Sequence, residues 1–527
     1  MPRSTGCARS AIHGGRTPEP RRLDGRLGII ASGLAGLALP LSFAPFYLFP
    51  LAPLSVAVLF AVWTRVPARR AFLCGWLYGL ACFGFGVFWI HESFQFNRIA
   101  IGWALLLTGL LVMFLALYPA IVGYGVVRLS RIGIADRRYQ LLLLMPAAWV
   151  LAEWVRGWFF TGFTWLQLGY SQVGFPLQGL LPVGGIYAAG FAVAVSAGLL
   201  VLAAREKGNG RWPWLAALIL MWAGAGLLGV VKWTEPAGDA LEVALVQGNM
   251  PQDKKWLPEM RRPTLERYLT LTREHWDADL IVWPESALPG LRDSFDGFIG
   301  GLAREARANN SHVVFGVPVL DRESLELFNS VFVVGQSTGS GEMVYHKRHL
   351  VPFGEYLPFD ALIRPVSEAL GLPVADFSLG PGTQPLLEAA GHRLGVSVCY
   401  EIAFGNEIVK ALPEAGVLVT VSNDAWFGTS IGPHQHMQIA RARAVETGRY
   451  LLRATNTGIT AIVAPDGAIE GRAPQFEVQV LEGEIFPMEG MTLYARTGDS
   501  VVIALVVLVL IGCFAASRGS SARHDAG

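Results

Sequence analysis

Eight apolar runs, each close to the length of a bilayer crossing, are the feature of this sequence that most restricts its fold. A helix needs about 20 mostly apolar residues to cross the hydrocarbon of a membrane. The runs lie at 27–44, 47–64, 71–90, 100–127, 141–157, 187–204, 213–231 and 501–517. Hydrophobic residues make up 52% of the chain and charged residues only 16%, which is too apolar for an ordinary soluble protein. We therefore expect a polytopic α-helical membrane domain of about eight transmembrane helices.

The positive charges between these runs predict how the chain crosses the membrane. Lysine and arginine are concentrated before the first run, in every second connection and after the last run. The positions are Arg21, Arg22, Arg26, Arg65, Arg69, Arg70, Arg128, Arg131, Arg137, Arg138, Arg205, Lys207, Arg211, Arg518 and Arg523. Because positive charge stays on the cytoplasmic side, we expect a multi-pass protein of a bacterial inner membrane with both termini in the cytoplasm.

These boundaries divide the chain into five segments. Residues 1–26 are expected to be a disordered basic tail, 27–231 a transmembrane domain of seven helices, and 232–500 a periplasmic domain. The eighth helix follows at 501–517, and 518–527 form a second cytoplasmic tail. The net charge of +1 provides no basic surplus for nucleic acid.

The polar insert between the seventh and eighth runs alternates between strand and helix patterns. Strands are expected at 243–247, 280–283, 312–319, 329–334, 343–347, 394–399, 417–422 and 450–454. Helices are expected at 264–276, 293–309, 402–412 and 432–447. Such alternation is typical of a layered α/β domain.

Cys399 stands at the end of one of these strands. Leu394, Val396 and Val398 alternate with small or polar residues, and helix-like sequence follows from Ile402. A cysteine at a strand-to-helix junction would find backbone N–H groups and the positive end of a helix dipole, which favour a thiolate. Seen alone, a single cysteine on an apolar strand is more often a small buried hydrophobe.

Three further residues follow strands in the same way. Glu285 comes just after a strand that Pro284 stops, and Lys347 follows the strand 343–347 with Glu355 eight residues on. Each alone is more often a solvated charge. Together they suit acyl chemistry, because a carboxylate can take the proton of a thiol and an ammonium can stabilise an oxyanion. We expect one sheet edge to present Glu285, Lys347 and Cys399 together.

The order of these residues and their local motifs resemble a known family. The motifs W-P-E-S, H-K-R-H-L-V-P-F-G-E and S-V-C-Y-E resemble the nitrilase, or carbon–nitrogen hydrolase, superfamily. With the apolar runs, the whole chain resembles the apolipoprotein N-acyltransferase family, and V-Q-G-N-M-P-Q, S-N-D-A-W-F-G and T-G-F-T-W-L-Q-L-G-Y-S-Q add to the likeness. The resemblance implies an α-β-β-α nitrilase-like sandwich on a helical membrane base.

The resemblance also implies a reaction and its partners. A fatty acyl chain would pass from a phospholipid, phosphatidylethanolamine, to a thioester on Cys399 and then to the α-amine of a diacylglyceryl apolipoprotein. Glu285 would be the proton acceptor, Lys347 the oxyanion stabiliser and Glu355 a second essential glutamate. Four more residues match positions beside the nucleophile or on arms near the site entrance: Trp256, Tyr400, Glu401 and Trp426. A monomer without cofactor is expected.

Two apolar segments of the periplasmic side fit a lipid substrate. The loop 156–186 carries five aromatic residues suited to a membrane interface, and either an aromatic belt or a substrate doorway explains them. They are Trp158, Phe159, Phe160, Trp165 and Tyr170. The segment 353–377 is too apolar for a soluble amidase and is expected to form a lid facing the bilayer.

Other functions remain as alternatives. A membrane-tethered hydrolase would use the same residues with water as the acceptor. A transporter is less favoured, because the apolar runs carry few charges of the kind that mark transport paths. His434 and His436 lie two apart at an expected helix start and face different ways, so a structural or polar role is favoured over a metal site.

Overall fold

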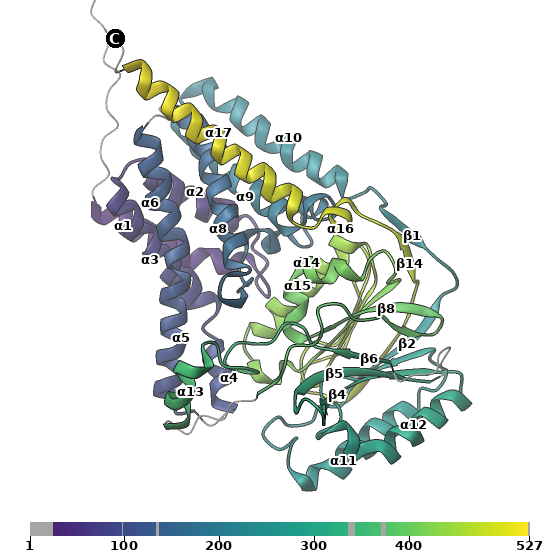
Figure 1. Cartoon of the computed structure of the whole chain (residues 1–527). Coiled ribbons are helices and arrows are strands. Elements are labelled where there is room, and N and C mark those ends of the chain that lie inside the picture. The colour runs from purple at the N-terminus through teal and green to yellow at the C-terminus, as the bar shows by residue number, and fades with distance from the viewer. Residues whose placement is uncertain (1–24, 97–98, 133–135, 336–342, 370–375, 525–527) are drawn as a thin grey trace, which may run out of the picture.

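The computed structural model describes residues 25–96, 99–132, 136–335, 343–369 and 376–524. It consists of a helical part and a β-rich part that pack against each other (Figure 1). The predicted amino-terminal tail lies outside the described residues except at its end, where helix α1 already begins at Gly25. The end of the predicted carboxyl-terminal tail also lies outside them.

In the part of the chain that the structure describes, the strands form two six-stranded sheets and one short pair. The first sheet has the order β13-β2-β3-β4-β5-β6 and the second β12-β11-β10-β9-β8-β7. The strands of the first sheet are β13 (Gln479–Ile485), β2 (Leu241–Gln247), β3 (Leu280–Val282), β4 (His312–Leu320), β5 (Leu327–Val334) and β6 (Met343–His346). Those of the second are β12 (Ile469–Arg472), β11 (Ala461–Val463), β10 (Leu451–Thr455), β9 (Val417–Ser422), β8 (His392–Val398) and β7 (Leu387–Ala389). The pair is β1 (Thr234–Pro236) with β14 (Met488–Gly490).

The two sheets pack face to face and helices cover both outer faces. One apolar core holds side chains of both sheets, including Val282 of β3 and Val398 of β8. A second core lies between the first sheet and helices α11 (Pro258–Arg273) and α12 (Asp296–Ala308). On the other side, α15 (Gly432–Thr447) shares a core with the membrane-type helices. This α-β-β-α order is the expected nitrilase-like sandwich.

Each of the eight apolar runs is helical, and the run 100–127 contains two consecutive helices, α5 and α6. The helices are α1 (Gly25–Ala38), α2 (Leu51–Trp63), α3 (Ala68–Gly86), α5 (Ile101–Leu115), α6 (Leu117–Ile132), α8 (Met145–Arg156), α9 (Leu181–Arg205), α10 (Trp212–Leu228) and α17 (Ser500–His524). Within the described residues, three continuous helical stretches are long and apolar enough to cross a membrane: Ile101–Arg131, Pro176–Arg205 and Gly208–Leu228. The count of eight crossings therefore stays a prediction.

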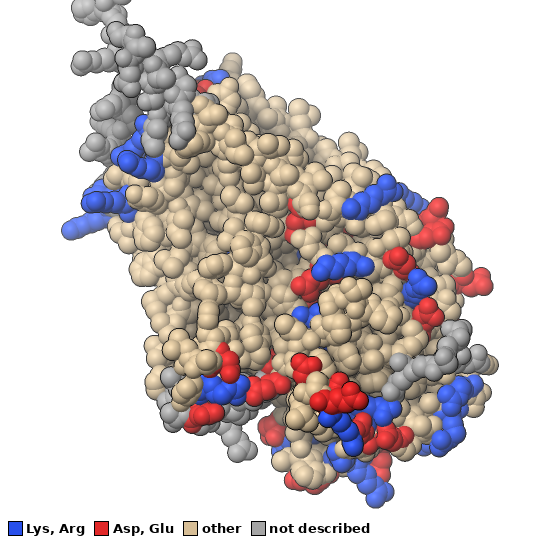
Figure 2. Space-filling view, viewed as in Figure 1, with Lys and Arg blue, Asp and Glu red and all other residues tan. Residues whose placement is uncertain are grey.

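The surface is divided in the same way as the fold. Figure 2 shows a face on which the helical part is almost free of charge between its two ends. Basic side chains gather at the end near α1 and α6, and both signs of charge cover the β-rich part near α11 and α12. An uncharged band of this kind suits contact with hydrocarbon.

Helix α15 joins the two parts. It differs from α12 because it is buried almost all round, with polar side chains at the contact. Gln438 accepts a hydrogen bond from the backbone of Ala44, and Gln435 donates to the carbonyl of Gly86. Glu446 accepts from the N–H of Ile186, just after α9 is broken at Gly184 and Gly185. The β-rich part is thereby fixed on the membrane-type helices.

Candidate functional site

The predicted site residues follow three strands that belong to two different sheets. Glu285 lies beyond β3 and Lys347 directly after β6, both in the first sheet, whereas Cys399 directly follows β8 of the second. The expectation of a single sheet edge is therefore wrong. The sandwich brings the strand ends together because the two sheets face each other across one core.

Glu285, Lys347, Glu355 and Asn329 form a buried group that we call the catalytic cluster, after the role that the sequence predicts for three of its members. The Nζ of Lys347 lies 2.8 Å from Oε2 of Glu355 and 3.8 Å from Oε1 of Glu285. The amide of Asn329, on β5, donates to Glu285 at 2.8 Å and to Glu355 at 3.1 Å. One ammonium and one amide thus hold both carboxylates in place.

The charges of the catalytic cluster are shifted by burial and by one another. Burial raises the pKa of Glu285, and the neighbouring Glu355 adds to the effect against the charge of Lys347. Burial alone would lower the pKa of Lys347, but the carboxylates of Glu355 and Glu285 outweigh it and raise that pKa. Lys347 therefore stays charged, and Glu285 is a stronger base than an exposed glutamate.

The Cys399 thiol is buried beside these charges. Burial and the charge of Glu285 raise the pKa of Cys399 to about 12, against the opposing effect of Lys347. The predicted helix after it is replaced by three short pieces: η8 (Cys399–Ala403), α14 (Gly405–Ile408) and η9 (Val409–Ala411). The expected helix-dipole stabilisation of a thiolate is therefore wrong. The thiol is therefore protonated at neutral pH.

The backbone of Cys399 is held in an uncommon conformation. Its φ is +52°, in the left-handed region that residues other than glycine seldom adopt. Glu401 belongs to the same turn and stabilises it, because its carboxylate accepts a hydrogen bond from the N–H of Val398 at 2.7 Å. The same carboxylate accepts from the hydroxyl of Tyr345 and from the N–H of Arg348. Glu401 thereby links the turn at Cys399 to the strand end that carries Lys347.

A second buried group contacts Cys399 from α15 and the second sheet. We call Asp424, His436 and Arg453 the support cluster. The Nε2–H of His436 donates to the carbonyl of Cys399 at 3.1 Å, and Nδ1 lies 3.0 Å from Oδ1 of Asp424. Arg453 donates to Oδ2 of Asp424 at 2.7 Å. Burial opposes ionisation of Asp424, but Arg453 and His436 outweigh it and lower its pKa.

The aromatic loop after α8 contacts the other side of the nucleophile's turn. The hydroxyl of Tyr400 donates to the carbonyl of Gly162 at 2.7 Å, and its ring stacks on Trp165 with centroids 5.6 Å apart. Trp165 and Tyr170 are buried, whereas Trp158 is 53% exposed. Phe159 and Phe160 are exposed as well. Only the outer three aromatic residues of the predicted five are thus placed to meet a membrane interface.

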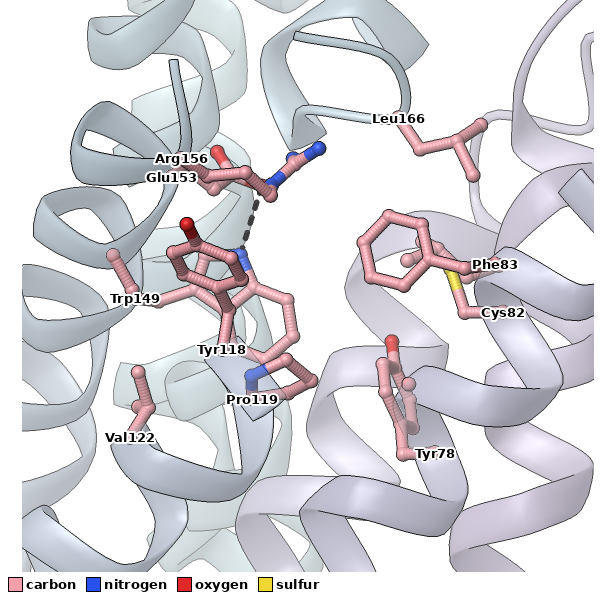
Figure 3. A pocket seen from close by; sticks show the side chains of 13 residues that line it. Tyr78, Cys82, Phe83, Tyr118, Pro119, Val122, Trp149, Glu153, Arg156 and Leu166 are labelled. Atoms are coloured by element: carbon pink, nitrogen blue, oxygen red, sulfur yellow. Dashed lines mark hydrogen bonds between the residues drawn. The ribbon is translucent and has the colours of Figure 1, made fainter. Parts of the chain in front are cut away.

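Polar residues inside the helical part hold this loop. Arg156 of α8 donates to the carbonyls of Phe163 and Trp165. Glu153 accepts from the N–H of Leu168 and from the indole of Trp149, the contact drawn in Figure 3. A cavity of about 30 Å³ beside them has room for a water molecule. Arg156 and Glu153 thus hold the aromatic loop in place, and the loop in turn contacts Tyr400.

The two predicted gating tryptophans lie on neighbouring arms. Trp256 is 50% exposed, and Trp426 lies in η10 (Asp424–Phe427) and is half-buried. Asn423 donates to Gln252 at 2.7 Å, which joins the two arms. The predicted lid contains α13 (Asp360–Ala369), and Leu362 is exposed on it. Positions 370–375 of the lid lie outside the described residues.

Sequence reasoning missed residues that the site uses. Asn329 was visible, beside Ser330, as a polar residue in the otherwise apolar run L-F-N-S-V-F, a sign of a buried hydrogen bond. Lys255 is fully buried and donates to the carbonyl of Glu285 at 3.3 Å, but nothing local distinguished it from the exposed Lys254. Arg453 and Tyr345 also lay inside strand patterns without a signal of their own.

Comparison with known proteins gives the family. Residues 242–490 match the carbon-nitrogen hydrolase model, and residues 35–199 match that of the apolipoprotein N-acyltransferase N-terminal domain. The chain is 44% identical to the apolipoprotein N-acyltransferase of Methylococcus capsulatus, over 93% of this chain and 96% of that protein. The chain belongs to the apolipoprotein N-acyltransferase family.

A second curated relative agrees with this family. The apolipoprotein N-acyltransferase of Vibrio cholerae is 40% identical, over 89% of this chain and 94% of that protein. Among solved structures, Saccharomyces cerevisiae Nit3, of branch 10 of the nitrilase superfamily, is 21% identical with a TM-score of 0.37. That match covers 49% of this chain and 93% of Nit3.

Proposed function

We propose that this chain moves a fatty acyl chain from a phospholipid, phosphatidylethanolamine, to the α-amine of the amino-terminal diacylglyceryl-cysteine of a lipoprotein. The observation that carries the proposal is the buried set of Glu285, Lys347 and Cys399 on a sandwich packed against apolar helices. The relatives' name, apolipoprotein N-acyltransferase, supports the acceptor. Trp256 and Trp426 would line the entrance.

The reaction has two halves that share one base. Glu285 takes the thiol proton as the sulfur of Cys399 attacks the ester carbonyl of the phospholipid, and Lys347 stabilises the resulting oxyanion. The C–O bond breaks, Glu285 returns the proton to the leaving lysophospholipid, and a thioester remains. The acceptor amine then attacks the thioester, loses its proton to Glu285 and forms an amide, while the sulfur leaves and regains that proton.

The pKa of Cys399 and the contacts of Glu355 agree with these roles. The raised pKa of Cys399 means that little thiolate exists before the reaction, so a base within the site has to act during the attack. Glu355 holds Lys347 at 2.8 Å and keeps its ammonium in place. This leaves Glu285, at 3.8 Å from the same nitrogen, as the carboxylate available to move a proton.

We further propose that the helical part crosses a bacterial inner membrane about eight times, with the catalytic part on the periplasmic side and both termini in the cytoplasm. The positive charge near α1 and α6, opposite the catalytic part, supports this orientation. A reporter fused at residue 300 is expected to be periplasmic and one fused after α17 cytoplasmic. The reverse result would overturn the orientation. We propose a monomer as the working unit.

The experiment that tests the reaction is intact-protein mass spectrometry. Purified protein mixed with phosphatidylethanolamine alone should gain one fatty-acyl mass, and a diacylglyceryl-cysteine peptide should then remove it by becoming N-acylated. Cys399→Ser should gain no such mass, whereas Cys513→Ser, on α17, should behave as the parent. Loss of the acyl group to water in the presence of the peptide would show a hydrolase instead.

A further inference from the structure

Lys255 is a buried cation to which the proposed reaction gives no role. Its side chain is fully buried. Among the residues that the structure describes, its Nζ makes one hydrogen bond, to the carbonyl of Glu285 at 3.3 Å, and no ion pair. Burying an ammonium without a carboxylate in contact costs free energy, and an apolar side chain of the same length would avoid that cost. The charge of Lys255 therefore has a purpose other than packing.

Two ammonium groups approach Glu285 from different sides. The Nζ of Lys347 lies 3.8 Å from the Glu285 carboxylate, whereas the Nζ of Lys255 contacts the backbone carbonyl of the same residue. Glu355 and Cys399 are the other titratable groups that interact with this carboxylate. Counting Lys255, two ammonium groups thus balance the two carboxylates of the catalytic cluster.

The charges of Lys255 and Glu285 stabilise each other. Burial and the charge of Glu355 raise the pKa of Glu285, and the ammonium groups of Lys347 and Lys255 oppose this rise. Burial lowers the pKa of Lys255 to about 8, against the effect of Glu285. Lys255 is therefore charged below about pH 8, and there its charge favours the ionised form of Glu285.

Lys255 also belongs to the arm that carries Trp256. The N–H groups of Lys254 and Lys255 both donate to the carbonyl of Pro251, at 3.1 and 2.9 Å, so the segment forms a tight turn. Within this turn Lys255 is fully buried, whereas Trp256 is 50% exposed. These two neighbouring residues connect the exposed arm to the backbone of Glu285.

We infer that Lys255 is a positioning residue, which holds the arm of Trp256 on the turn of Glu285 and whose charge keeps the Glu285 carboxylate ionised and ready to take the thiol proton. This inference rests on the proposed function of Glu285 as the base. The hydrogen bond to the backbone carbonyl sets the position of the arm, and the charge sets the proton affinity of the carboxylate. Lys255 acts through Glu285 and needs no contact with the substrate.

The pH dependence of Cys399 alkylation tests the effect of the charge. The full chain in detergent is treated with iodoacetamide in the absence of lipid, and mass spectrometry of the Cys399 peptide gives the rate. The rate should fall as Glu285 takes up its proton at low pH. Lys255→Met removes the charge and should move this fall to higher pH. Lys254→Met, at the exposed neighbour on the same arm, should leave the fall where the parent has it.

The Glu285→Gln background separates this inference from the proposed function. Glu285→Gln should abolish the fall, and adding Lys255→Met should then change the alkylation rate no further. A fall at the same pH in the parent and in Lys255→Met would overturn the inference but leave the base in place. A fall that persists in Glu285→Gln would overturn both. An equal loss of rate from Lys255→Met in both backgrounds would show that Lys255 serves packing alone.

Hydrogen exchange tests the hold on the arm, and it does not depend on the chemistry. The N–H groups of Lys254, Lys255 and Leu257 are hydrogen-bonded within the turn, so the peptide 251–257 should exchange faster once the turn loosens. We expect faster exchange in Lys255→Met and the parent's rate in Lys254→Met. Lys255→Gln, which keeps a polar side chain but no charge, should move the fall in alkylation in the same direction as Lys255→Met. Exchange at the parent's rate in Lys255→Met would overturn its role in holding the arm.

Discussion

The catalytic cluster and the support cluster are both buried beside Cys399, yet their charges are balanced differently. In the catalytic cluster two carboxylates share one ammonium, and the pKa of Glu285 is raised. In the support cluster one carboxylate faces one guanidinium, and the pKa of Asp424 is lowered. When two carboxylates share one ammonium, one of the carboxylates can take up and release a proton. A carboxylate that is matched by one guanidinium stays ionised. The first arrangement suits chemistry and the second suits scaffolding.

Removing the base should have the largest effect on the reaction. Glu285→Gln keeps the hydrogen bond from Asn329 and the shape of the side chain but cannot take the thiol proton. We expect the rate of acyl-enzyme formation to fall by about 100- to 10,000-fold, with the melting temperature little changed. Rapid-quench mass spectrometry measures the rate. Glu388→Gln, at a partly exposed glutamate of β7, is the control. A fall of less than about tenfold in the acylation rate of Glu285→Gln would refute the proposed role of Glu285 as the base.

Breaking the support cluster should instead affect stability. Arg453→Met leaves Asp424 buried without its guanidinium, which costs about 3–5 kcal/mol of unfolding free energy. Thermal unfolding in detergent measures this, and Arg322→Met, at an 80% exposed side chain, should change stability by at most about 0.5 kcal/mol. A variant that unfolds like the parent but has lost its activity would show that the support cluster takes part in the chemistry.

Sequence patterns predicted the sandwich well where period and length were clear. The helix 432–447 coincides with α15, and the strand 417–422 with β9. The sequence predicted one helix over 402–412, because its apolar residues have helical spacing. This prediction was wrong, since Phe404 adopts a non-helical conformation between η8 and α14. Local pattern does not encode the packing of that turn against the aromatic loop.

The candidate site shows the same limit. Glu285, Lys347 and Cys399 were visible because each follows a strand and carries reactive chemistry. The contacts that hold them run between segments far apart in the chain, such as Glu401 with Tyr345 and His436 with Cys399. Which sheet each strand joins, and hence which side chains meet, depends on the tertiary fold.

The pH dependence of acylation should report the catalytic cluster directly. Because the pKa of Glu285 is raised above its usual 4.5, the base is lost as pH falls through that higher value, so activity should decline at a pH above 4.5. The amide of Asn329 donates to the carboxylate and opposes this rise. Asn329→Ala should therefore move the decline to higher pH. A profile of kcat/KM against pH checks it, and a shift to lower pH would contradict the assignment.

The smallest expected effect concerns the contact between the two sheets at the nucleophile. Tyr345→Phe removes the hydroxyl that donates to Glu401 at 3.0 Å, but Glu401 keeps the N–H groups of Val398, Arg348 and His349. We expect a loss of about 1 kcal/mol in stability and less than about tenfold in kcat, with KM unchanged. Tyr450→Phe, whose hydroxyl meets the surface residue Glu470, is the control. The turn of Cys399 keeps its other hydrogen bonds in this variant. A fall in kcat of more than about 100-fold would therefore mean that the Tyr345 hydroxyl acts in the reaction itself.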